Sequence, residues 1–295
     1  MASIVSSILR SQIKLLNPII RGMTIEQSRK GQDAVGKIGS RALEGSVHYK
    51  LVRFPLFDAA WAIPLSGRVN KAILYLHGGG YVAGGLPYAQ VFGGHLAVST
   101  GRASLCVGYR LAPEDPFPAA LDDALLSYRE MLTRFAPEDI AFVGESAGGG
   151  LVYALPLYLK ELNLPLPGKI VSISPWTDMT MQRDVSELQK LDPIILRENV
   201  IEYADMYAVD HDRRNPLLSP LFGDLAGMPP SLIIVGSYEI LLDDSRLMQQ
   251  ALLEAGCDCR LHVEEGLWHV YVLYGVPEAK EAMRLIEEFL QEELP

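Results

Sequence analysis

Cysteine is scarce in this sequence, and long hydrophobic runs are missing. The chain of 295 residues contains 3 cysteines, at Cys106, Cys257 and Cys259, with no CxxC spacing and no histidines placed to complete a zinc site. These features exclude a disulfide framework and predict reduced thiols, no metal and a reducing compartment. No window approaches the roughly 20 consecutive apolar residues that cross a bilayer, so we expect no stable membrane insertion.

The first part of the chain also lacks the features of a secretory signal. Residues 1–20 are rich in isoleucine and leucine, but Arg10 and Lys14 interrupt the apolar stretch. No basic segment precedes an uninterrupted apolar run with a small-residue cleavage site. The expectation is therefore a cytoplasmic protein.

Positive charge is in deficit as well. The chain has 26 Lys plus Arg against 36 Asp plus Glu, a formal net charge of -10 at pH 7. That sign opposes binding to nucleic acid and to anionic membrane surfaces. With 49% hydrophobic and 21% charged residues, the composition is that of a folded globular protein. We therefore expect a small-molecule partner and no nucleic acid.

Short apolar runs of strand length alternate with helical patterns over most of the chain. The apolar runs lie at 47–54, 61–63, 72–76, 104–107, 140–143, 170–173, 232–235 and 259–263. The helical patterns lie at 119–133, 147–161, 243–255 and 278–290. This alternation predicts an α/β fold with a mostly parallel central sheet and helices on both faces, and the first two runs, with no long helix between them, predict an antiparallel edge.

Two segments depart from this alternation. Residues 4–20 have helical spacing broken by Asn17 and Pro18, and residues 178–222 carry two helical patterns and three prolines but no strand pattern. An insertion at the carboxyl edge of the sheet, together with the N-terminal helices, would make a small helical cap. The predicted organisation is therefore N-terminal cap helices at 1–45, the first part of the core at 46–177, the cap insertion at 178–222, and the second part of the core at 223–295.

The most informative motif is GESAG at 144–148. It directly follows one apolar run and directly precedes a helical pattern. A nucleophilic serine requires such a sharp strand-to-helix turn, and Gly144 and Gly148 leave room there that a Cβ would occupy. Ser146 is therefore the predicted nucleophile, and its neighbour Glu145 is predicted to be structural.

A second glycine motif, HGGG at 77–80, also follows a strand pattern. Glycines leave their N–H groups unshielded, so the N–H groups of Gly79 and Gly80, with that of Ala147 after the nucleophile, are the predicted oxyanion hole. Gly78 is the weaker donor candidate. The G-K-[ST] of a phosphate-binding loop is missing, which argues against a nucleotide site.

A catalytic serine needs a base, and in this motif order the histidine comes last. His262 lies within the alternating strand pattern RLHVEE, whereas His269 lies in the loop before the final helix. His269 is therefore the predicted base, and activity should rise with pH through the ordinary histidine range, at about 6.5. The earlier His77 is expected to orient the glycine loop.

The segment GSYEILLDDS at 236–245 offers three candidate acids. Glu239 lies in the loop just after an apolar run, whereas Asp243 and Asp244 lie where the next helix begins and suit its first turn. We predict Glu239 as the acid, with Asp243 as the alternative. A glutamate suffices, because the acid need only accept the Nδ1 hydrogen bond and stabilise the imidazolium.

Four blocks occur in one order along the chain: HGGG, YRLAPEDPFPAALDD at 109–123, GESAGG, and the acid and histidine segments. With these blocks the sequence resembles the hormone-sensitive-lipase family of α/β-hydrolase carboxylesterases, also called bacterial family IV. The resemblance implies the α/β-hydrolase fold, a helical cap and compatibility with a homodimer, and the predicted triad chemistry itself requires no metal or cofactor. In many relatives the acid is the first Asp of a D-P-L-x-D segment; here Glu239 stands in its place, and Ile240 replaces the proline.

The loop at 109–123 has no evident chemistry of its own. Its prolines predict a rigid structural loop, supported by Asp122 or Asp123. Three aromatic residues near the predicted site are expected either to line the substrate pocket or to pack within the core: Tyr81, Tyr88 and Trp176.

The predicted activity is hydrolysis of short- to medium-chain carboxylic esters through an acyl-enzyme on a triad of Ser146, His269 and Glu239. The same machinery would also serve an amidase or arylformamidase, because the triad does not choose between ester and amide. A non-catalytic ligand receptor is the third alternative, as in the plant gibberellin receptors, which resemble this family and have lost the histidine. Retention of all three residues argues against it.

Overall fold

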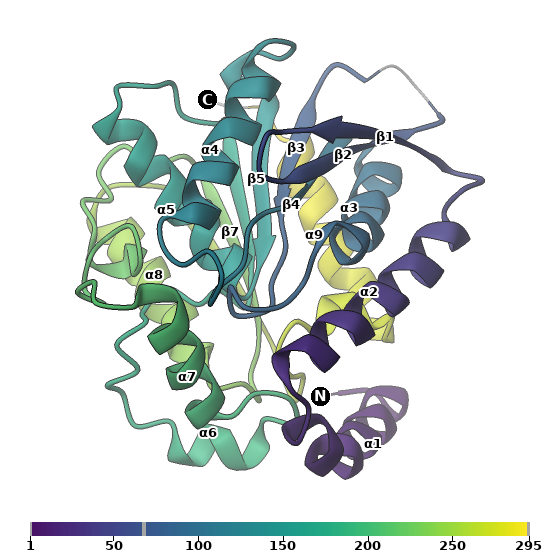
Figure 1. Ribbon diagram of the computed structural model, residues 1–295, viewed down its shortest axis with the longest axis vertical. Helices are drawn as coiled ribbons and strands as arrows, with labels where there is room; N and C mark the ends of the chain where they lie inside the picture. The colour runs from purple at the N-terminus through teal and green to yellow at the C-terminus, as the bar shows by residue number, and fades with distance from the viewer. Residues whose placement is uncertain (1, 67–68, 294–295) are drawn as a thin grey trace.

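The computed structural model describes residues 2–66 and 69–293, apart from the side chains of residues 17–21. These residues form a sheet of 8 strands in the order β1-β2-β4-β3-β5-β6-β7-β8 (Figure 1). Pairs β1–β2 and β2–β4 are antiparallel and the remaining pairs are parallel, which confirms the predicted α/β fold with an antiparallel edge. The strands are β1 (Val47–Arg53), β2 (Asp58–Pro64), β3 (Ala72–Leu76), β4 (Ala103–Gly108), β5 (Ile140–Glu145), β6 (Lys169–Ile173), β7 (Ser231–Gly236) and β8 (Cys259–Glu264).

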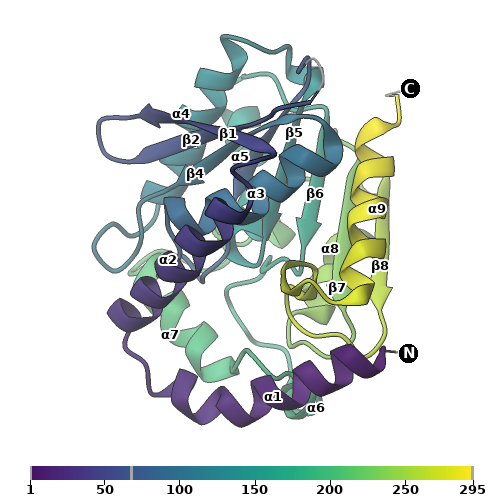
Figure 2. The same cartoon turned by 90° about the vertical axis from the view of Figure 1, so that its right-hand side faces the viewer.

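Helices cover both faces of the sheet. Every residue of β3, β5, β6 and β7 is buried, as expected for parallel strands covered on two sides. Two separate hydrophobic clusters, one on each face, account for this burial. One face carries α3 (Leu86–Thr100) and α9 (Pro277–Gln291), which lie on the same side in Figure 2. The other carries α4 (Ala119–Leu132), α5 (Ala147–Glu161) and α8 (Leu242–Glu254).

Helix α3 has no counterpart among the helices predicted from the sequence. Its residues are apolar on nearly all sides, so the segment lacks the amphipathic spacing that identifies a surface helix. It also contains Gly93 and Gly94, which disfavour a helix in isolation. Both glycines are needed for close packing, because a Cβ on Gly93 would lie 2.3 Å from Cys106 Sγ and one on Gly94 would lie 2.3 Å from the Tyr49 hydroxyl. Tertiary contacts therefore outweigh the low intrinsic propensity.

Four further helices gather at the carboxyl end of the parallel strands (Figures 1 and 2). They are α1 (Ile4–Arg21), α2 (Ile25–Ala42), α6 (Ser186–Leu191) and α7 (Arg197–Ala208), and short 3-10 turns lie at Pro137–Asp139, Pro220–Phe222 and Tyr271–Tyr274. The predicted break at Asn17 and Pro18 is wrong, since α1 continues to Arg21. A proline removes one helical hydrogen bond without preventing helical φ and ψ. Lys14 Nζ of α1 donates to the carbonyl of Lys190 in α6 at 3.1 Å, which joins the N-terminal segment to the 178–222 segment.

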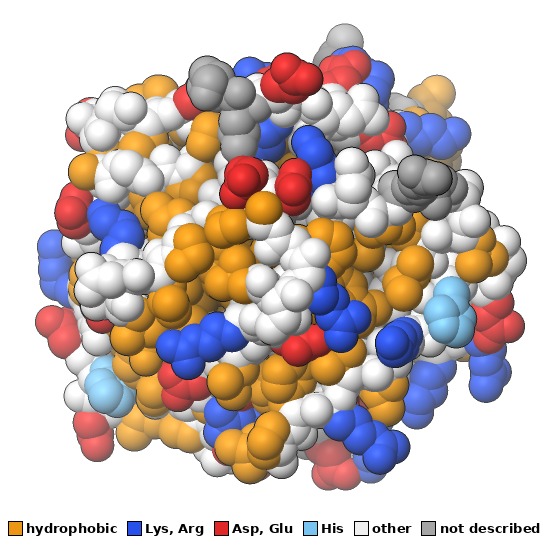
Figure 3. All heavy atoms as spheres, turned by 90° about the horizontal axis from the view of Figure 1, so that it is seen from above, with side chains coloured by type: hydrophobic (Ala, Val, Ile, Leu, Met, Phe, Trp, Pro, Cys, Tyr) orange, Lys and Arg blue, Asp and Glu red, His pale blue; other side chains and the backbone are white. Residues whose placement is uncertain are grey.

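The surface seen from above in Figure 3 mixes hydrophobic side chains with charged side chains of both signs. None of the helices in the described part of the chain has the length and hydropathy of a transmembrane span. Cys106, Cys257 and Cys259 are free and buried. Within residues 2–66 and 69–293 there is no group of three or more His, Cys, Asp or Glu side chains arranged to hold a metal ion.

Candidate active site

Ser146 lies on the sharp turn between β5 and α5, the predicted strand-turn-helix. Its backbone has φ 55° and ψ -119°, a conformation that costs a non-glycine residue about 1–3 kcal/mol. Close packing makes both flanking glycines necessary. A Cβ on Gly144 would lie 2.4 Å from the Gly148 carbonyl oxygen, and one on Gly148 would lie 2.0 Å from the Leu76 carbonyl oxygen. Any larger residue at either position would push the serine turn away from the sheet.

Backbone hydrogen bonds hold this strained turn from both sides. The Ser146 N–H donates to the carbonyl of Ile173 at 2.9 Å. Its own carbonyl accepts from the N–H of Gly150 at 3.1 Å and from the N–H of Trp176 at 3.0 Å. The serine is therefore fixed by the ends of two neighbouring parallel strands, β5 and β6, and by the first turn of α5.

The HGGG loop follows β3 at the same edge of the sheet. Gly79 has φ +110° and Gly80 has φ +64°, conformations that L side chains rarely adopt. Ala147 is the first residue of α5, where N–H groups have no acceptor within the helix. Gly78 differs, because its N–H donates to Glu145 Oε1 at 2.6 Å. The N–H of Gly78 is thus engaged inside the protein, and Gly79, Gly80 and Ala147 remain the candidate oxyanion donors.

Glu145, directly before the serine, is fully buried between β3 and the glycine loop. In addition to Gly78, it accepts a hydrogen bond from the Tyr75 hydroxyl at 2.7 Å. Burial raises the pKa of this carboxyl to about 8, and its hydrogen-bond donors act in the opposite direction. This side chain ties the HGGG loop to the nucleophile turn.

His77 is buried away from solvent and is held by neighbouring groups of the protein. Its ring is fully buried, stacks on Tyr109 with centroids 4.1 Å apart, and Nδ1 lies 2.7 Å from the carbonyl of Gly78. Burial lowers the pKa of His77 to about 4. The neutral ring therefore orients the glycine loop by donating to Gly78.

His269 and Glu239 meet at the carboxyl end of the sheet, 2.8 Å apart between Nδ1 and Oε2. Glu239 is fully buried, and its other oxygen accepts from Ser174 Oγ at 2.8 Å and from the Gly236 N–H at 2.7 Å. Ser174 Oγ in turn accepts from the N–H of Val270 at 3.0 Å. Ser174 thus connects the loop of the acid to the loop of the histidine. Within the described residues no hydrogen bond joins His269 to Ser146, a link that often tightens only when substrate is bound.

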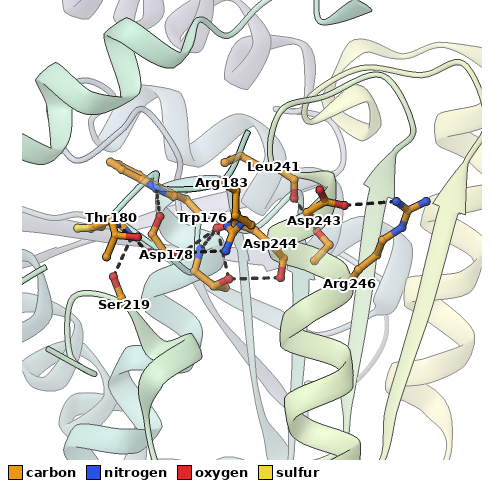
Figure 4. A network of polar contacts seen from close by, with 12 residues as sticks. Trp176, Asp178, Thr180, Arg183, Ser219, Leu241, Asp243, Asp244 and Arg246 are labelled. Carbon is orange, nitrogen blue, oxygen red and sulfur yellow. Dashed lines mark hydrogen bonds and ion pairs between the residues drawn. The ribbon is translucent and has the colours of Figure 1, made fainter. Parts of the chain in front are cut away.

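The alternative acids and histidine have other partners. Asp243 lies on the exposed side of α8, where it pairs with Arg246 at 3.3 Å (Figure 4). Asp244 is buried and accepts from the N–H groups of Thr177 at 2.9 Å and Asp178 at 3.0 Å. His262 lies on β8 and contacts Glu264 at 3.0 Å. Among the described residues, no hydrogen bond or ion pair joins any of the three to His269 or Glu239.

Arg183, in the 178–222 segment, forms ion pairs with Asp178 and Asp244. Its guanidinium pairs with Asp178 at 2.8 Å and also with Asp244, so it bridges the segment and the start of α8 (Figure 4). Burial raises the pKa of Asp244 to about 7, and the charge of Arg183 opposes that rise. The bridge fixes the loop that carries Trp176, whose N–H supports Ser146.

The aromatic residues named from the sequence mainly pack. Tyr81 stacks on Tyr207 of α7 with centroids 3.9 Å apart, and its hydroxyl donates to the carbonyl of Ala147 at 2.8 Å. The indole N–H of Trp176 donates to the Asp178 carbonyl at 3.1 Å. Tyr88 is half-buried. These contacts make Tyr81 and Trp176 supports of the site rather than open walls of a pocket.

The loop at 109–123 has the structural role that its prolines suggested. Asp123 is fully buried and accepts from the Arg110 N–H at 2.8 Å and from its guanidinium at 2.8 Å. Tyr109 donates its hydroxyl to the carbonyl of His77 at 2.6 Å. The loop therefore supports the HGGG segment through the hydrogen bond from Tyr109 to His77.

Sequence reasoning missed three polar residues of this region: Ser174, Arg183 and Asp192. Ser174 directly follows β6 at the carboxyl edge of the sheet, and that position was a readable signal for it. Arg183 and Asp192 lie in the 178–222 segment, and only the folded chain brings them beside the core.

Comparison with known proteins places this geometry in a family. Residues 73–273 match the model of a family described as having the alpha/beta hydrolase fold. An acetyl-hydrolase of Streptomyces hygroscopicus is 37% identical over 237 residues, 79% of this chain and 79% of that protein. An esterase of Acinetobacter venetianus is 33% identical over 77% of each chain. The crystal structure of an esterase from the bacterial hormone-sensitive lipase family superposes with a TM-score of 0.90, 34% identity and 99% coverage of both chains.

Both the sequence match and the superposition extend over the serine turn, the glycine loop and the histidine loop. The chain therefore belongs to the α/β-hydrolase family, as a carboxylic ester hydrolase of the hormone-sensitive-lipase group.

Proposed function

We propose that this enzyme hydrolyses esters through a Ser-His-Glu triad of Ser146, His269 and Glu239. The observation that carries the proposal is the 2.8 Å contact between His269 Nδ1 and Glu239 Oε2, in loops at the same sheet edge as the strained serine turn. A buried carboxylate in that position fixes the imidazole tautomer, so that Nε2 is free to act as a base.

The reaction follows from these roles. Ser146 Oγ attacks the ester carbonyl carbon while His269 Nε2 takes the hydroxyl proton. The bond from carbon to the alcohol oxygen then breaks, and the imidazolium returns the proton to the leaving alkoxide. A water molecule, deprotonated by the same imidazole, next attacks the acyl-serine. The carboxylic acid leaves, and Ser146 regains its proton from His269.

The negative charge that develops on the carbonyl oxygen needs donors that are already in place. The N–H groups of Gly79, Gly80 and Ala147 are the proposed oxyanion hole, because Gly78 already donates to Glu145. Removal of one such donor typically costs about 10²- to 10³-fold in kcat. Glu145 and His77 hold this loop through Gly78, so the donors need no rearrangement as the charge forms.

We further propose that residues 1–45 and 178–222 form a cap that limits the length of the acyl chain. The Tyr203 ring of α7 lies against Gly80, since a Cβ on that glycine would be 2.5 Å from Tyr203 Cδ2. The space beside the oxyanion donors is therefore bounded on the α7 side. This boundary, and the acetyl-hydrolase name of the Streptomyces relative, support short- to medium-chain esters as substrates.

The test is hydrolysis of p-nitrophenyl esters, from acetate to laurate, by wild type and four variants. Ser146→Ala and His269→Ala should abolish turnover, and Glu239→Gln should lower kcat by about 10²- to 10⁴-fold. Asp243→Asn is the matched control, because this neighbouring carboxylate is exposed and paired with Arg246. Short esters should react fastest.

Two results would contradict the proposal. A crippled Asp243→Asn with an active Glu239→Gln would move the acid by four residues. Turnover that persists in Ser146→Ala would remove the triad itself. Paired ester and amide substrates with the same acyl group should show a clear preference for the ester, and a preference for the amide would reassign the substrate class.

A further inference from the structure

Asp192, in the 178–222 segment, is buried against the loop of the proposed triad acid. It follows α6 directly and is 4% exposed. Its Oδ1 accepts the N–H groups of Ile194 at 2.8 Å and Ile195 at 2.9 Å. These two bonds fix the carboxylate within its own turn, so its orientation is set before it contacts the core.

The second oxygen of Asp192 crosses to the core. Oδ2 accepts the N–H of Ile240 at 3.1 Å, and Ile240 directly follows Glu239. Inside the protein, Glu239 is held by Ser174 and Gly236. The acid loop is thus held from the core side through the side chain of Glu239 and from the 178–222 segment through the backbone of the next residue.

The charges around Asp192 add a second effect. The titratable groups that act on this carboxyl are His269, which lowers its pKa, and Glu239, which raises it, while burial is the largest influence and brings the pKa to about 6. Tyr274, on the turn that follows His269, also lies within electrostatic range of Asp192. An ionised Asp192 therefore places negative charge near the imidazole, where it favours the imidazolium.

We propose that Asp192 is a positioning residue for the triad, through which the 178–222 segment holds Glu239 in line with His269 and stabilises the imidazolium of the transition state. The proposal rests on the proposed function, because it requires His269 to act as the base. It goes further by making the 178–222 segment part of the catalytic geometry as well as a cover for it.

Two variants separate this role from general stability. Asp192→Asn keeps an oxygen for Ile194 and Ile195 but turns an NH₂ group toward the N–H of Ile240 and removes the charge. Ile240→Pro leaves Asp192 in place and removes the donor. Proline suits this position, because the Leu242 N–H donates to the Glu239 carbonyl at 3.2 Å and makes Ile240 the second residue of a turn. Asp184→Asn is the matched control, since Asp184 is exposed and accepts a local hydrogen bond from the Ser186 N–H at 2.9 Å.

The expected result is measured on p-nitrophenyl acetate. Asp192→Asn should lower kcat roughly tenfold, the effect of losing a hydrogen bond to a charged group, with KM nearly unchanged. Loss of the nearby negative charge disfavours the protonated imidazole, so the acid limb of the kcat/KM profile should move to lower pH by roughly half a unit. Ile240→Pro should also lower kcat several-fold. Asp184→Asn should match wild type in both kcat and pH profile.

The outcomes distinguish this inference from the proposed function. Wild-type kcat and pH profile in Asp192→Asn, or wild-type kcat in Ile240→Pro, would overturn the role of Asp192 while Ser146-dependent turnover still supports the triad. Turnover that persists in Ser146→Ala would overturn the triad first. Circular dichroism and Tm establish folding, and if Asp192→Asn does not fold, Ile240→Pro decides the question.

Discussion

Glu145 accepts a 2.6 Å hydrogen bond from the N–H of Gly78. One carboxyl therefore links the residue before the proposed nucleophile to the loop that carries the proposed oxyanion donors. The serine turn and the glycine loop come from different strands, and this contact sets their relative position. It also removes Gly78 from the set of donors that a substrate could use.

Truncation of Glu145 should weaken catalysis through this loop. In Glu145→Ala the Gly78 N–H and the Tyr75 hydroxyl lose their acceptor in a buried site, so we expect kcat/KM to fall by about 10- to 100-fold and stability to fall by about 2–3 kcal/mol. Glu145→Gln keeps an oxygen for Gly78 and should retain most activity. Steady-state kinetics on p-nitrophenyl butyrate with urea unfolding tests both, and equal loss in the two variants would contradict the prediction.

Glu145 should also make the free energy of unfolding depend on pH. Burial raises the pKa of Glu145 from its ordinary 4.5 to about 8, so the folded protein binds a proton that the unfolded chain has released. The free energy of unfolding from this group therefore falls as pH rises between those two values. Wild type should lose stability relative to Glu145→Gln across that window, as measured by urea unfolding at several pH values. A difference that does not change with pH would show that burial does not shift this pKa.

Gly80 and Gly101 form a matched pair of left-handed glycines, with φ +64° and +68°. A Cβ on Gly80 would meet the Tyr203 ring at 2.5 Å, whereas one on Gly101 would meet nothing within 4 Å. Gly80→Ala should therefore lower kcat by about 10²-fold or more by displacing the oxyanion loop. Gly101→Ala should cost only about 1 kcal/mol of stability and leave kcat unchanged. Similar kcat values in the two variants would remove Gly80 from the proposed oxyanion hole.

Asp244 and Asp243 are neighbours with opposite surroundings. The side chain of Asp244 is 2% exposed and pairs with Arg183, whereas that of Asp243 is 39% exposed and pairs with Arg246. Asp244→Ala leaves Arg183 and two backbone N–H groups without this acceptor, so unfolding free energy should fall by about 3 kcal/mol or more. Asp243→Ala should change it by less than about 0.5 kcal/mol. Equal Tm shifts in the two variants would contradict the bridging role of Arg183.

The three cysteines give a simple solution test. All are buried and free, and burial raises the pKa of Cys106 to about 12, which suppresses its reactive thiolate. A thiol reagent such as Ellman's should therefore react slowly with the native protein and with three thiols once guanidinium unfolds it. A count of one under non-reducing denaturation would mean that two cysteines form a disulfide.

Much of the fold could be predicted from the order of apolar runs. The parallel strands that are buried on both faces read as short continuous apolar segments, and the antiparallel and edge strands also show apolar runs of strand length, so all eight strands were recognisable. Helix α3 was not, because its residues are apolar on nearly all sides and it contains Gly93 and Gly94, which pack closely against β4 and β1 only in the folded chain. The first helix was predicted, but its continuation past Pro18 was not, because a proline lowers helix propensity without fixing where a helix ends.

In the candidate site, local sequence was enough to predict a strand, a tight turn and a helix around Ser146, and glycines with unshielded N–H groups at 79 and 80. Local position also favoured Glu239 over Asp243, because a residue just past a strand faces the carboxyl edge of the sheet. The folded chain determines which groups meet across that edge. It paired Glu239 with His269, used the N–H of Gly78 for Glu145, and brought Asp192 to Ile240. These contacts join residues 30 to 67 positions apart in the chain, where no local pattern reports which partner is in reach.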